Sequence, residues 1–365
     1  MNSENIMKGN YMEMLKLNET PVRTSRNFNI NNIKLKDINI PADIREFNNV
    51  NITNNSSKIN ISSGVRDISL TYGVGEVLIN QLKKNCNKKL NLQVDCLQNK
   101  EVIIDFDFNS DNDTLLEHVE IVTSENSKST IILKYISSDN NEYWHNGLLK
   151  VYANKNSEVN IVIANLMNTN SNNFMSIESI LDENAKVNYT IIDFGGKNSI
   201  TNYYSNLLGD NSDNSLNTIY LGKENQLFDL NYIGELRGKK SNIDIEVQGA
   251  LKDNAKKHFK GTIDFKKGCK KAKGNENEAC MLLSDTAKSI ALPMLLCSEE
   301  DVEGNHSSSA GKIGEKELFY IMSRGFELKE AMKLMVRAKF NKILANIKNE
   351  ELVEEILNEI DKRLD

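Results

Sequence analysis

Cysteine and histidine are the residues of this chain best suited to bind a borderline metal such as iron, and both are scarce. The 365 residues include four histidines and five cysteines. The cysteines are Cys86, Cys96, Cys269, Cys280 and Cys297, and no two of them form a CxxC pair. We therefore expect neither a disulfide framework nor a zinc site built from neighbouring ligands, and four histidines are too few for a His-rich metal centre.

His306 is the histidine that stands out, because a run of small residues, Ser-Ser-Ser-Ala-Gly, follows it. Imidazole is a good ligand for iron, and it can take up or release a proton near neutral pH. A histidine at the start of a loop of small residues is also compatible with a plain structural role, bonded to the beginning of a helix. The residues alone leave both interpretations open.

Cys280 precedes an apolar Met-Leu-Leu run in a segment that we expect to be a strand. A thiolate there is suited to bind iron–sulfur clusters, but a single cysteine in a strand is more often buried packing. We expect Cys297 to be packing of this kind, and Cys86 and Cys96 to be structural. Cys269 lies in KKGCKKAKGN, a basic turn that favours a lowered thiol pKa, although we expect a solvated loop.

An internal repeat has to position these residues. Five ten-residue blocks each open with small polar residues and then alternate, with apolar residues at thirteen of the fifteen positions numbered six, eight and ten. Period-two alternation indicates a strand with one buried face. The blocks begin at Ser124, Asn154, Asp182, Asn211 and Gly238, so the period is 27 to 30 residues.

Position seven of every block is polar, and five such positions form a stack. They are Thr130, Asn160, Asn188, Asn217 and Asp244. Stacked amides and carboxylates are compatible with a metal-binding ladder, but we expect a solvated face.

A second strand recurs out of phase with the first, at starts that are 27 to 29 residues apart. These starts are Gly147, Met175, Asn202, Asn231 and His258. Two strands in each unit of about 28 residues predict a wound β-solenoid, because stacked units pair every backbone with the coils above and below. A sandwich or a jelly roll has no reason to keep a fixed period.

The flanking segments differ from the repeats. At the N-terminal side we expect a short amphipathic helix at Met12–Leu17, an extended arm over 20–44, a strand pair within 48–62 and a helix over 75–85. At the C-terminal side, the spacing predicts helices over 315–323, 327–346 and 350–364, with Gly325 ending the first. These helices are expected to cap the open end of the solenoid.

Composition and the absence of common motifs exclude several classes. The net charge is -6, which disfavours nucleic acid, and no apolar stretch is long enough to span a membrane. The N-terminal residues do not look like a secretory signal, so we expect a cytoplasmic protein. No P-loop, GxGxxG, GxSxG or HExxH is present, so any ATP hydrolysis must come from a partner.

Residues 279–340 resemble the C-terminal signature of the SufB/SufD family of iron–sulfur cluster assembly proteins. The shared order is an LLSD segment, LP-x-L, an acidic residue followed by valine, the histidine, and then GKIGEKELFYIMSRG and an amphipathic helix. HFKGTIDF and LNETPVRTSRNF are weaker matches. The chain is similar to SufD more than to SufB, since it lacks the long cysteine-bearing N-terminal region of many SufB proteins.

The resemblance implies a mostly β fold with a right-handed parallel β-helix as its core. We expect an N-terminal helical or irregular segment over 1–95, the β-helix over 96–310 and a C-terminal α-helical domain over 311–365. The implied function is a non-catalytic scaffold subunit of a SUF-type assembly complex, and not an enzyme. The implied partners are a SufB-type homologue and a SufC-type ATPase, with a role in iron acquisition and with neither nucleic acid nor membrane as partner.

The resemblance also assigns candidate residues. His306 corresponds to a family histidine at the SufB–SufD interface, and the scaffold cysteine of SufB relatives falls close to Glu278 and Cys280. We expect no stably bound cofactor, only transient iron or an iron–sulfur cluster between the subunits. In the family the C-terminal helices dock the ATPase, which here gives the candidates Phe319, Tyr320, Met322, Arg324, Met332, Met335, Arg337 and Phe340. The alternative for these residues is a hydrophobic cap.

Two departures from the family pattern leave alternatives open. HSSSAG replaces the commoner HGATVG, and Gly304 stands where a cysteine usually precedes the histidine. A homodimeric, SufB-like scaffold therefore stays an alternative. A β-solenoid enzyme acting on polysaccharide is a more distant one, since such enzymes need clustered carboxylates and are usually exported.

Overall fold

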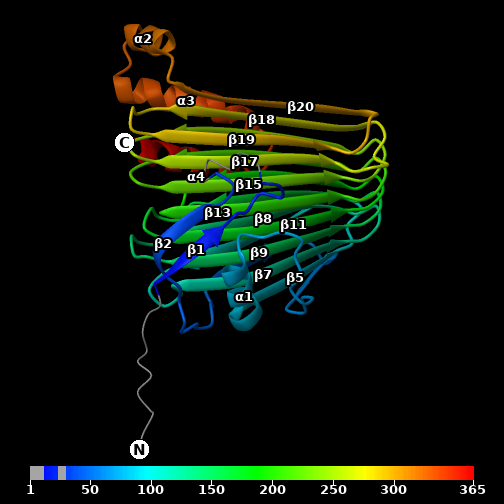
Figure 1. Ribbon diagram of the computed structural model, residues 1–365. Coiled ribbons are helices and arrows are strands. Elements are labelled where there is room, and N and C mark those ends of the chain that lie inside the picture. Colours follow the sequence, from blue (N-terminus) through cyan, green and yellow to red (C-terminus); the bar gives the residue numbers. More distant parts are fainter. Residues whose placement is uncertain (1–11, 24–29) are drawn as a thin grey trace, which may run out of the picture.

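The computed structural model describes residues 12–23 and 30–365. Its core is a stack of coils, each giving one strand to each of two nine-stranded sheets (Figure 1). The first sheet contains, in spatial order, β20 (Val302–Lys312), β18 (Ala272–Leu282), β16 (Asn242–Leu251), β14 (Asp213–Gly222), β12 (Lys186–Asp193), β10 (Glu158–Asn165), β8 (Lys128–Ser137), β6 (Lys100–Phe108) and β3 (Val50–Asn54). The second contains β19 (Lys288–Cys297), β17 (Lys256–Phe265), β15 (Leu227–Leu236), β13 (Asn198–Leu207), β11 (Asn172–Leu181), β9 (Trp144–Ala153), β7 (Thr114–Thr123), β5 (Lys88–Val94) and β4 (Ile59–Ser62).

The predicted solenoid is confirmed, and the repeat phase explains it. Within each sheet the strands of the repeats pair in parallel and without a register shift, so that Val159 lies beside Val187 and Ile161 beside Tyr189. Residues at positions six, eight and ten of the blocks therefore face the interior, where they are buried. The second strands begin two to four residues earlier than the pattern indicated, because the residues before each expected start also join the ladder.

The corners between the two sheets explain the polar start of each block. Asn126, Asn156, Asn184 and Asn211 all have positive φ angles, between 56° and 62°. Asparagine tolerates this left-handed conformation better than most residues. The side-chain amides of Asn156, Asn184 and Asn211 each donate to the side-chain oxygen of the asparagine one coil below, at 2.9 to 3.1 Å. The turns thus stack in the same register as the strands.

The two ends of the stack are different. At the N-terminal end, β3 and β4 pair antiparallel with β6 and β5 and close the two sheets. At the C-terminal end, β20 and β19 are the edge strands, and no described strand covers them (Figure 1). The interior of the solenoid is therefore exposed at this end, which we call the open end.

The N-terminal segment corrects two expectations. Met12–Leu17 is strand β1, not a helix, and it pairs antiparallel with β2 (Ile33–Asn39). Its apolar residues alternate, and Leu15 and Leu17 pack on the outer face of the second sheet. The two strands within 48–62 do not pair with each other, because each joins a different sheet. Part of the expected arm, residues 24–29, lies outside the described residues.

Four helices complete the described chain. Helix α1 (Glu76–Asn85) confirms the predicted helix, and it covers the outer face of the second sheet through Leu78 and Leu82. The other three, α2 (Glu315–Ser323), α3 (Leu328–Leu344) and α4 (Glu350–Leu364), match the predicted C-terminal ranges to within two residues. Helices α3 and α4 pack on the outer face of the first sheet, not over its open end. Among the described residues, no helix has the length and apolar character needed to cross a membrane.

Polar side chains form a connected network inside the solenoid, between the apolar layers. The Tyr135 hydroxyl donates to Glu117 at 2.5 Å, and His145 lies between Glu117 and Asn173. Gly147 makes room for this pair, since a Cβ atom there would lie 2.9 Å from a Glu117 oxygen. Buried polar groups of this kind are favourable only when they are bonded to one another.

The network continues to Asp193, whose carboxylate accepts hydrogen bonds from Ser199 and Asn165. Complete burial nevertheless raises its pKa from 3.8 to about 6. Because the folded-state pKa is the higher one, the native state holds the proton more tightly than the unfolded chain does. Asp193 therefore stabilises the fold most below pH ~4, and this contribution is lost as the pH rises through about 6.

Replacing this carboxyl by its neutral isostere tests that cause. We expect the unfolding free energy of the wild type to fall by about 3 kcal/mol between pH 4 and pH 7. Asp193→Asn should not show this fall. The measurement is urea unfolding across that range, with the exposed corner variant Asp182→Asn as control. Equal pH profiles for wild type and Asp193→Asn would show that burial does not perturb this group.

Candidate functional site

The open end brings the candidate residues of the last two coils together. Strand β20 pairs with β18 in parallel, and His306 lies beside Glu276, Ser308 beside Glu278 and Ala310 beside Cys280. Residues paired in this way point to the same side of the sheet. In β18 this side is the buried one. His306 therefore projects from the inner face of the last coil, above the interior of the solenoid.

His306 lies within a strand and not in a loop, which corrects the expectation from the small residues around it. The run of serine, alanine and glycine is long enough to pair along its whole length with β18. Because no described coil lies above β20, the His306 side chain is exposed although it points inward. An imidazole in this position is free to bind a ligand at the end of the solenoid.

Glu278 lies two residues beyond Glu276 in β18, and its negative charge is already compensated. Its carboxylate forms an ion pair of 2.6 Å with Lys257, and both side chains are completely buried. The Ser308 hydroxyl donates to its second oxygen at 2.8 Å. A carboxylate held by a buried lysine is a poor metal ligand, since removing it leaves an uncompensated charge.

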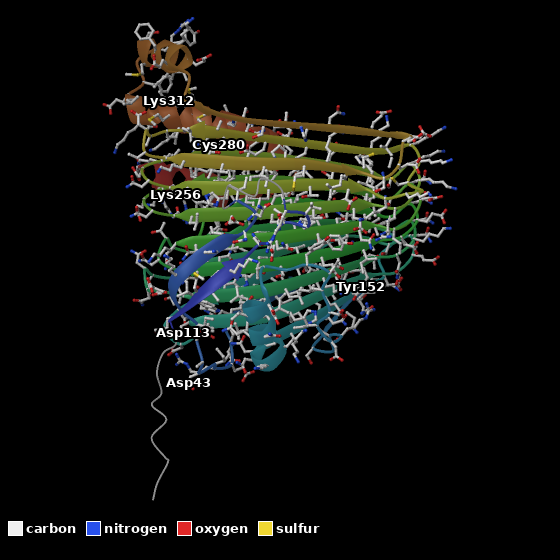
Figure 2. The ribbon with its side chains drawn as sticks, in the orientation of Figure 1. Asp43, Asp113, Tyr152, Lys256, Cys280 and Lys312 are labelled. Carbon is white, nitrogen blue, oxygen red and sulfur yellow. The ribbon has the colours of Figure 1, made fainter. Side chains whose placement is uncertain are left out.

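Cys280 lies on the same inner face and near the C-terminal end of the stack, as Figure 2 shows, and is 3% exposed. Burial raises the pKa of its thiol, while the Tyr220 hydroxyl and the Lys257 charge partly oppose the increase. The thiol is therefore protonated at neutral pH and has little thiolate character. These surroundings favour the packing role over the ligand role for the isolated chain.

Glu276 is the residue at this end that the sequence analysis missed. It is only 2% exposed, and neither carboxylate oxygen has a hydrogen-bond partner among the described residues. The carboxyl occupies the space above Gly261, where a Cβ atom would lie 2.1 Å from Oε2. Burial and the Glu278 charge raise its pKa to about 8. The alternation in KGNENEAC places Glu276 on the buried face of the strand, so the sequence could have predicted this buried carboxyl.

Two other cysteines differ from what the sequence suggested. Cys297 is exposed, not buried, since it points inward from the uncovered last coil, and its thiol donates to the Glu299 carbonyl at 2.9 Å. Cys269 is buried, and its pKa rises to about 11, chiefly through burial, so the basic turn does not activate it. Nowhere in the described ranges, 12–23 and 30–365, do three or more His, Cys, Asp or Glu side chains form a group that could hold a metal ion.

The candidate ATPase-binding residues divide into two groups. Phe319, Tyr320, Met322 and Arg324 belong to α2 and its end, and Phe319 is 74% exposed. No residue of α2 is buried, and the helix stands away from the solenoid (Figure 1). We call the exposed apolar side chains of this region the α2 surface: Phe319, Tyr320, Met322, Phe326, Leu328 and Leu334.

The α3 candidates have structural partners. Phe340 is completely buried and stacks on Phe194, which directly follows β12, at 6.3 Å between ring centroids. Arg337 forms an ion pair with Asp361 of α4. Met332 and Met335 are half-buried. Phe340 and Arg337 thus hold the helices on the sheet, whereas the side chains of the α2 surface stay exposed.

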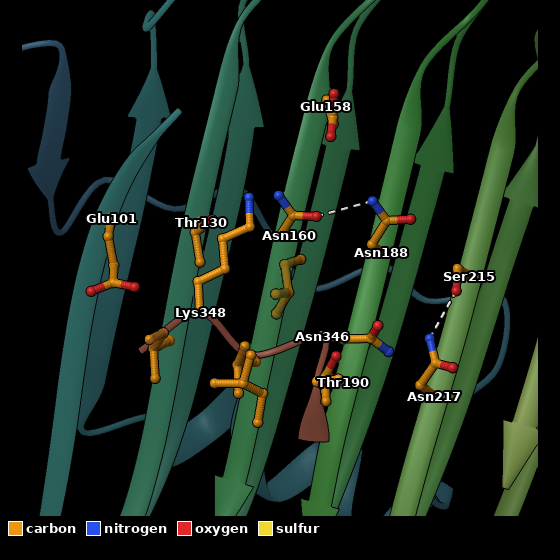
Figure 3. Close-up of a pocket in the computed structure, with 15 residues that line it drawn as sticks. Glu101, Thr130, Glu158, Asn160, Asn188, Thr190, Ser215, Asn217, Asn346 and Lys348 are labelled. Atoms are coloured by element: carbon orange, nitrogen blue, oxygen red, sulfur yellow. Dashed lines mark hydrogen bonds between the residues drawn. The ribbon is translucent and has the colours of Figure 1, made fainter. Parts of the chain in front are cut away.

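The polar stack at position seven lies where the sequence placed it, on the outer face of the first sheet. Thr130, Asn160, Asn188 and Asn217 line a groove of about 340 Å³ beneath the α3–α4 connection (Figure 3). Asn188 donates to Asn160 at 3.0 Å, so the amides satisfy one another. The groove shows an amide ladder and no cluster of carboxylates.

The two carboxylates at this groove have partners of their own. Glu158 pairs with Lys128 at 3.2 Å, and Glu101 accepts from Asn349 at 3.1 Å. Glycoside hydrolysis needs two facing carboxyl groups with different protonation states. This groove offers no such pair of free carboxyl groups.

Comparison with known proteins agrees with the geometry. Residues 106–339 match the family model described as SUF system FeS cluster assembly, SufBD core domain. The chain is 25% identical over 256 residues to the iron-sulfur cluster assembly protein SufD of Bacillus subtilis, covering 69% of this chain and 59% of that protein. It is 21% identical over 241 residues to SufD of Escherichia coli, covering 66% and 57%.

A third relative is an iron-sulfur cluster assembly SufBD family protein of Pyrococcus horikoshii, 28% identical over 240 residues, which covers 56% of this chain and 53% of the relative. The chain thus spans between half and three fifths of the length of these curated relatives. The expected resemblance, nearer to SufD than to SufB, is confirmed.

The unpartnered carboxyl at the open end has a measurable consequence. Because the folded-state pKa of Glu276 is raised to about 8, its contribution to stability is full below pH ~4.5 and is lost as the pH rises through about 8. We expect Glu276→Gln to equal the wild type at pH 5 and to be more stable by about 4 kcal/mol at pH 9. Urea unfolding of the isolated chain at both values measures this, and a variant that is destabilised equally at both would contradict it.

Proposed function

The chain belongs to the SufBD core family of the SUF system for iron–sulfur cluster assembly, and from this membership we propose that it is a non-catalytic scaffold subunit of a SUF-type complex. The observation that supports this most is the open end, where His306 and Glu276 face an uncovered interior. This end offers a partial set of ligands, which suits a subunit that shares a site with a partner.

The proposed partner at the open end is a SufB-type subunit. Strand β20 presents eleven residues that are exposed or half-buried, and one of its two backbone edges has no described strand beside it. Exposed edges of this kind are usually covered, and a partner strand that extends the sheet satisfies the free backbone groups. Pairing there places His306 in the interface.

Iron, or a nascent iron–sulfur cluster, is the cargo of the proposed complex. His306 supplies one nitrogen ligand from this chain, and Glu276 lies one strand below it as a carboxyl without a partner. Most of the thiolates, the usual cluster ligands, are then expected from the partner, because Cys280 is buried with a raised thiol pKa and Cys297 is the one exposed cysteine on the inner face of the last described coil. In the same proposal, His306 takes part in iron acquisition.

The α2 surface is the proposed docking site of a SufC-type ATPase. Large apolar side chains that stay exposed on one projecting helix indicate an interaction site. Aromatic residues and methionine, with Arg324 beside them, are enriched at protein interfaces. ATP hydrolysis by that partner could then move the helical region and the solenoid attached to it, since this chain carries no nucleotide-binding motif of its own.

The His306 assignment is tested in the assembled complex. We expect His306→Ala, co-expressed with a SufB-type subunit and a SufC-type ATPase, to lower the iron and sulfide that co-purify by about tenfold, with unchanged fold and subunit ratio. The matched control is Ser307→Ala, one residue away and facing outward. Normal iron and sulfide content in the His306 variant would refute the role.

The same co-expression tests the ATPase site. We expect Phe319→Ser to reduce the ATPase recovered with this chain by at least tenfold, because removing one exposed aromatic anchor commonly costs about 2 kcal/mol of binding. Leu208→Ser, at an exposed corner of the solenoid, serves as the control.

Measuring the molecular mass of the chain alone and with each partner separates the heteromeric complex from the homodimeric alternative.

A further inference from the structure

A second cavity lies near the N-terminal end of the stack, on the outer face of the second sheet. It has a volume of about 270 Å³. Its walls are the loop 65–68, the last turn of α1, and the strands β5 and β7, which contribute Lys89 and His118. This size lies just below that of ordinary small-molecule sites, which suits a ligand of few atoms.

The loop that forms one wall is fixed on both sides. Asn91 donates to the Gly64 carbonyl at 2.6 Å, just before the loop, and Lys150 donates to the Ser69 carbonyl at 2.5 Å, just after it. Both donors belong to the sheet below. The opposite wall is fixed by Leu82 of α1, which is completely buried. The cavity is therefore held open by the fold and does not depend on a loose surface loop.

The charges at this cavity are unbalanced. Arg66, Lys83 and Lys89 line it, against one carboxylate, Asp67. In the described part of the chain none of the three cations has an ion-pair partner. The Arg66 guanidinium lies 4.0 Å from the centre of the Tyr152 ring, which holds it in place; Figure 2 marks Tyr152 on this side of the molecule. In a chain with a net charge of -6, this local excess of positive charge favours an anion over a cation.

The floor of the cavity carries a buried histidine with an unused ring nitrogen. His118 is 1% exposed, and its Nε2 has no hydrogen-bond partner among the residues that the structure places. Buried polar atoms normally have a partner, so one without it at the floor of a cavity indicates a group that is supplied from outside. Burial, and then the charges of Lys150 and Lys89, lower the His118 pKa to about 4, so the ring is neutral at neutral pH.

Cys86 argues against a metal cation in the same place. Its thiol donates to the Lys88 carbonyl at 3.2 Å, and burial raises its pKa, so that it carries no negative charge at neutral pH. Three cations beside the Cys86 thiol and the His118 ring disfavour a divalent metal through charge repulsion. The same set does suit a ligand that brings negative oxygen atoms.

We propose that this cavity binds a small multivalent oxyanion, of phosphate or carboxylate chemistry. Arg66, Lys83 and Lys89 provide charge-assisted hydrogen bonds to its oxygens, and the His118 ring forms the base. The site is separate from the open end, and it does not rest on the proposed assembly function.

The position of Lys83 at the end of α1 also has a simpler explanation, which the experiment has to separate from anion binding. Lys83 and Lys84 both lie in the last turn of α1, where positive charge stabilises a helix whatever it binds. Only Lys83 lines the cavity. The two variants Lys83→Gln and Lys84→Gln remove the same charge from the same helix turn and therefore form a matched pair.

The experiment is calorimetric titration of the full chain with inorganic phosphate and, separately, with citrate, with sodium chloride at equal ionic strength as the screening control. We expect at least one of the two anions to bind with a Kd below ~10 mM, and Lys83→Gln and Lys89→Gln each to weaken that binding by about tenfold. Lys84→Gln should change it by less than about twofold. The anion that binds distinguishes phosphate from carboxylate chemistry.

A second readout keeps the proposal testable if a variant is unstable. In the wild-type chain, the NMR signals of the His118 ring, identified with His118→Gln, should shift on addition of the anion, while those of His145, inside the solenoid, should not. Equal weakening by Lys83→Gln and Lys84→Gln, or no response to either anion beyond that to chloride, would overturn the proposal.

Discussion

Parallel pairing of identical coils in one register is the constraint on which this structure depends. Each coil needs a neighbour on both sides for its backbone hydrogen bonds and for its inner apolar row. The asparagine ladder at the corners and the unshifted pairing of β10 with β12 keep that register. A stack of this kind has two ends by necessity. Here one end is closed by β3 and β4, and the other is left with uncovered strands and an exposed interior.

The open end differs from the remaining interior in what its inner positions carry. In most coils these positions are apolar, or belong to a hydrogen-bonded polar network such as the one that joins Tyr135, Glu117 and His145. In the last coils they are Glu276, Glu278 and His306 instead. Lys257 compensates Glu278, but nothing described compensates Glu276. The uncompensated carboxyl lowers the stability of the isolated chain at this end, which is typical of a surface that functions with a partner.

The three C-terminal helices differ in what their apolar residues do. Helices α3 and α4 bury Phe340, Ile343 and Ile356 against the outer face of the first sheet, so they stabilise the solenoid from the side. Helix α2 buries nothing and keeps Phe319 and Tyr320 exposed. The amphipathic pattern of 327–346 did not reveal this division, since Met332 and Phe340 are equally apolar in sequence but differ in burial.

Period and alternation along the chain were sufficient to establish the solenoid, the inner and outer residues of its repeats and the C-terminal helices. A strand that is buried on one face alternates apolar and polar residues, so its pattern can be read directly from the sequence. They were not sufficient for Met12–Leu17, which pairs with β2, or for His306, which extends a sheet in spite of its small neighbours. Pairing partners and ends are properties of the stacked molecule. Only there do Glu276 and His306 become neighbours, and only there does an inward position such as Cys297 become exposed, because no coil lies above it.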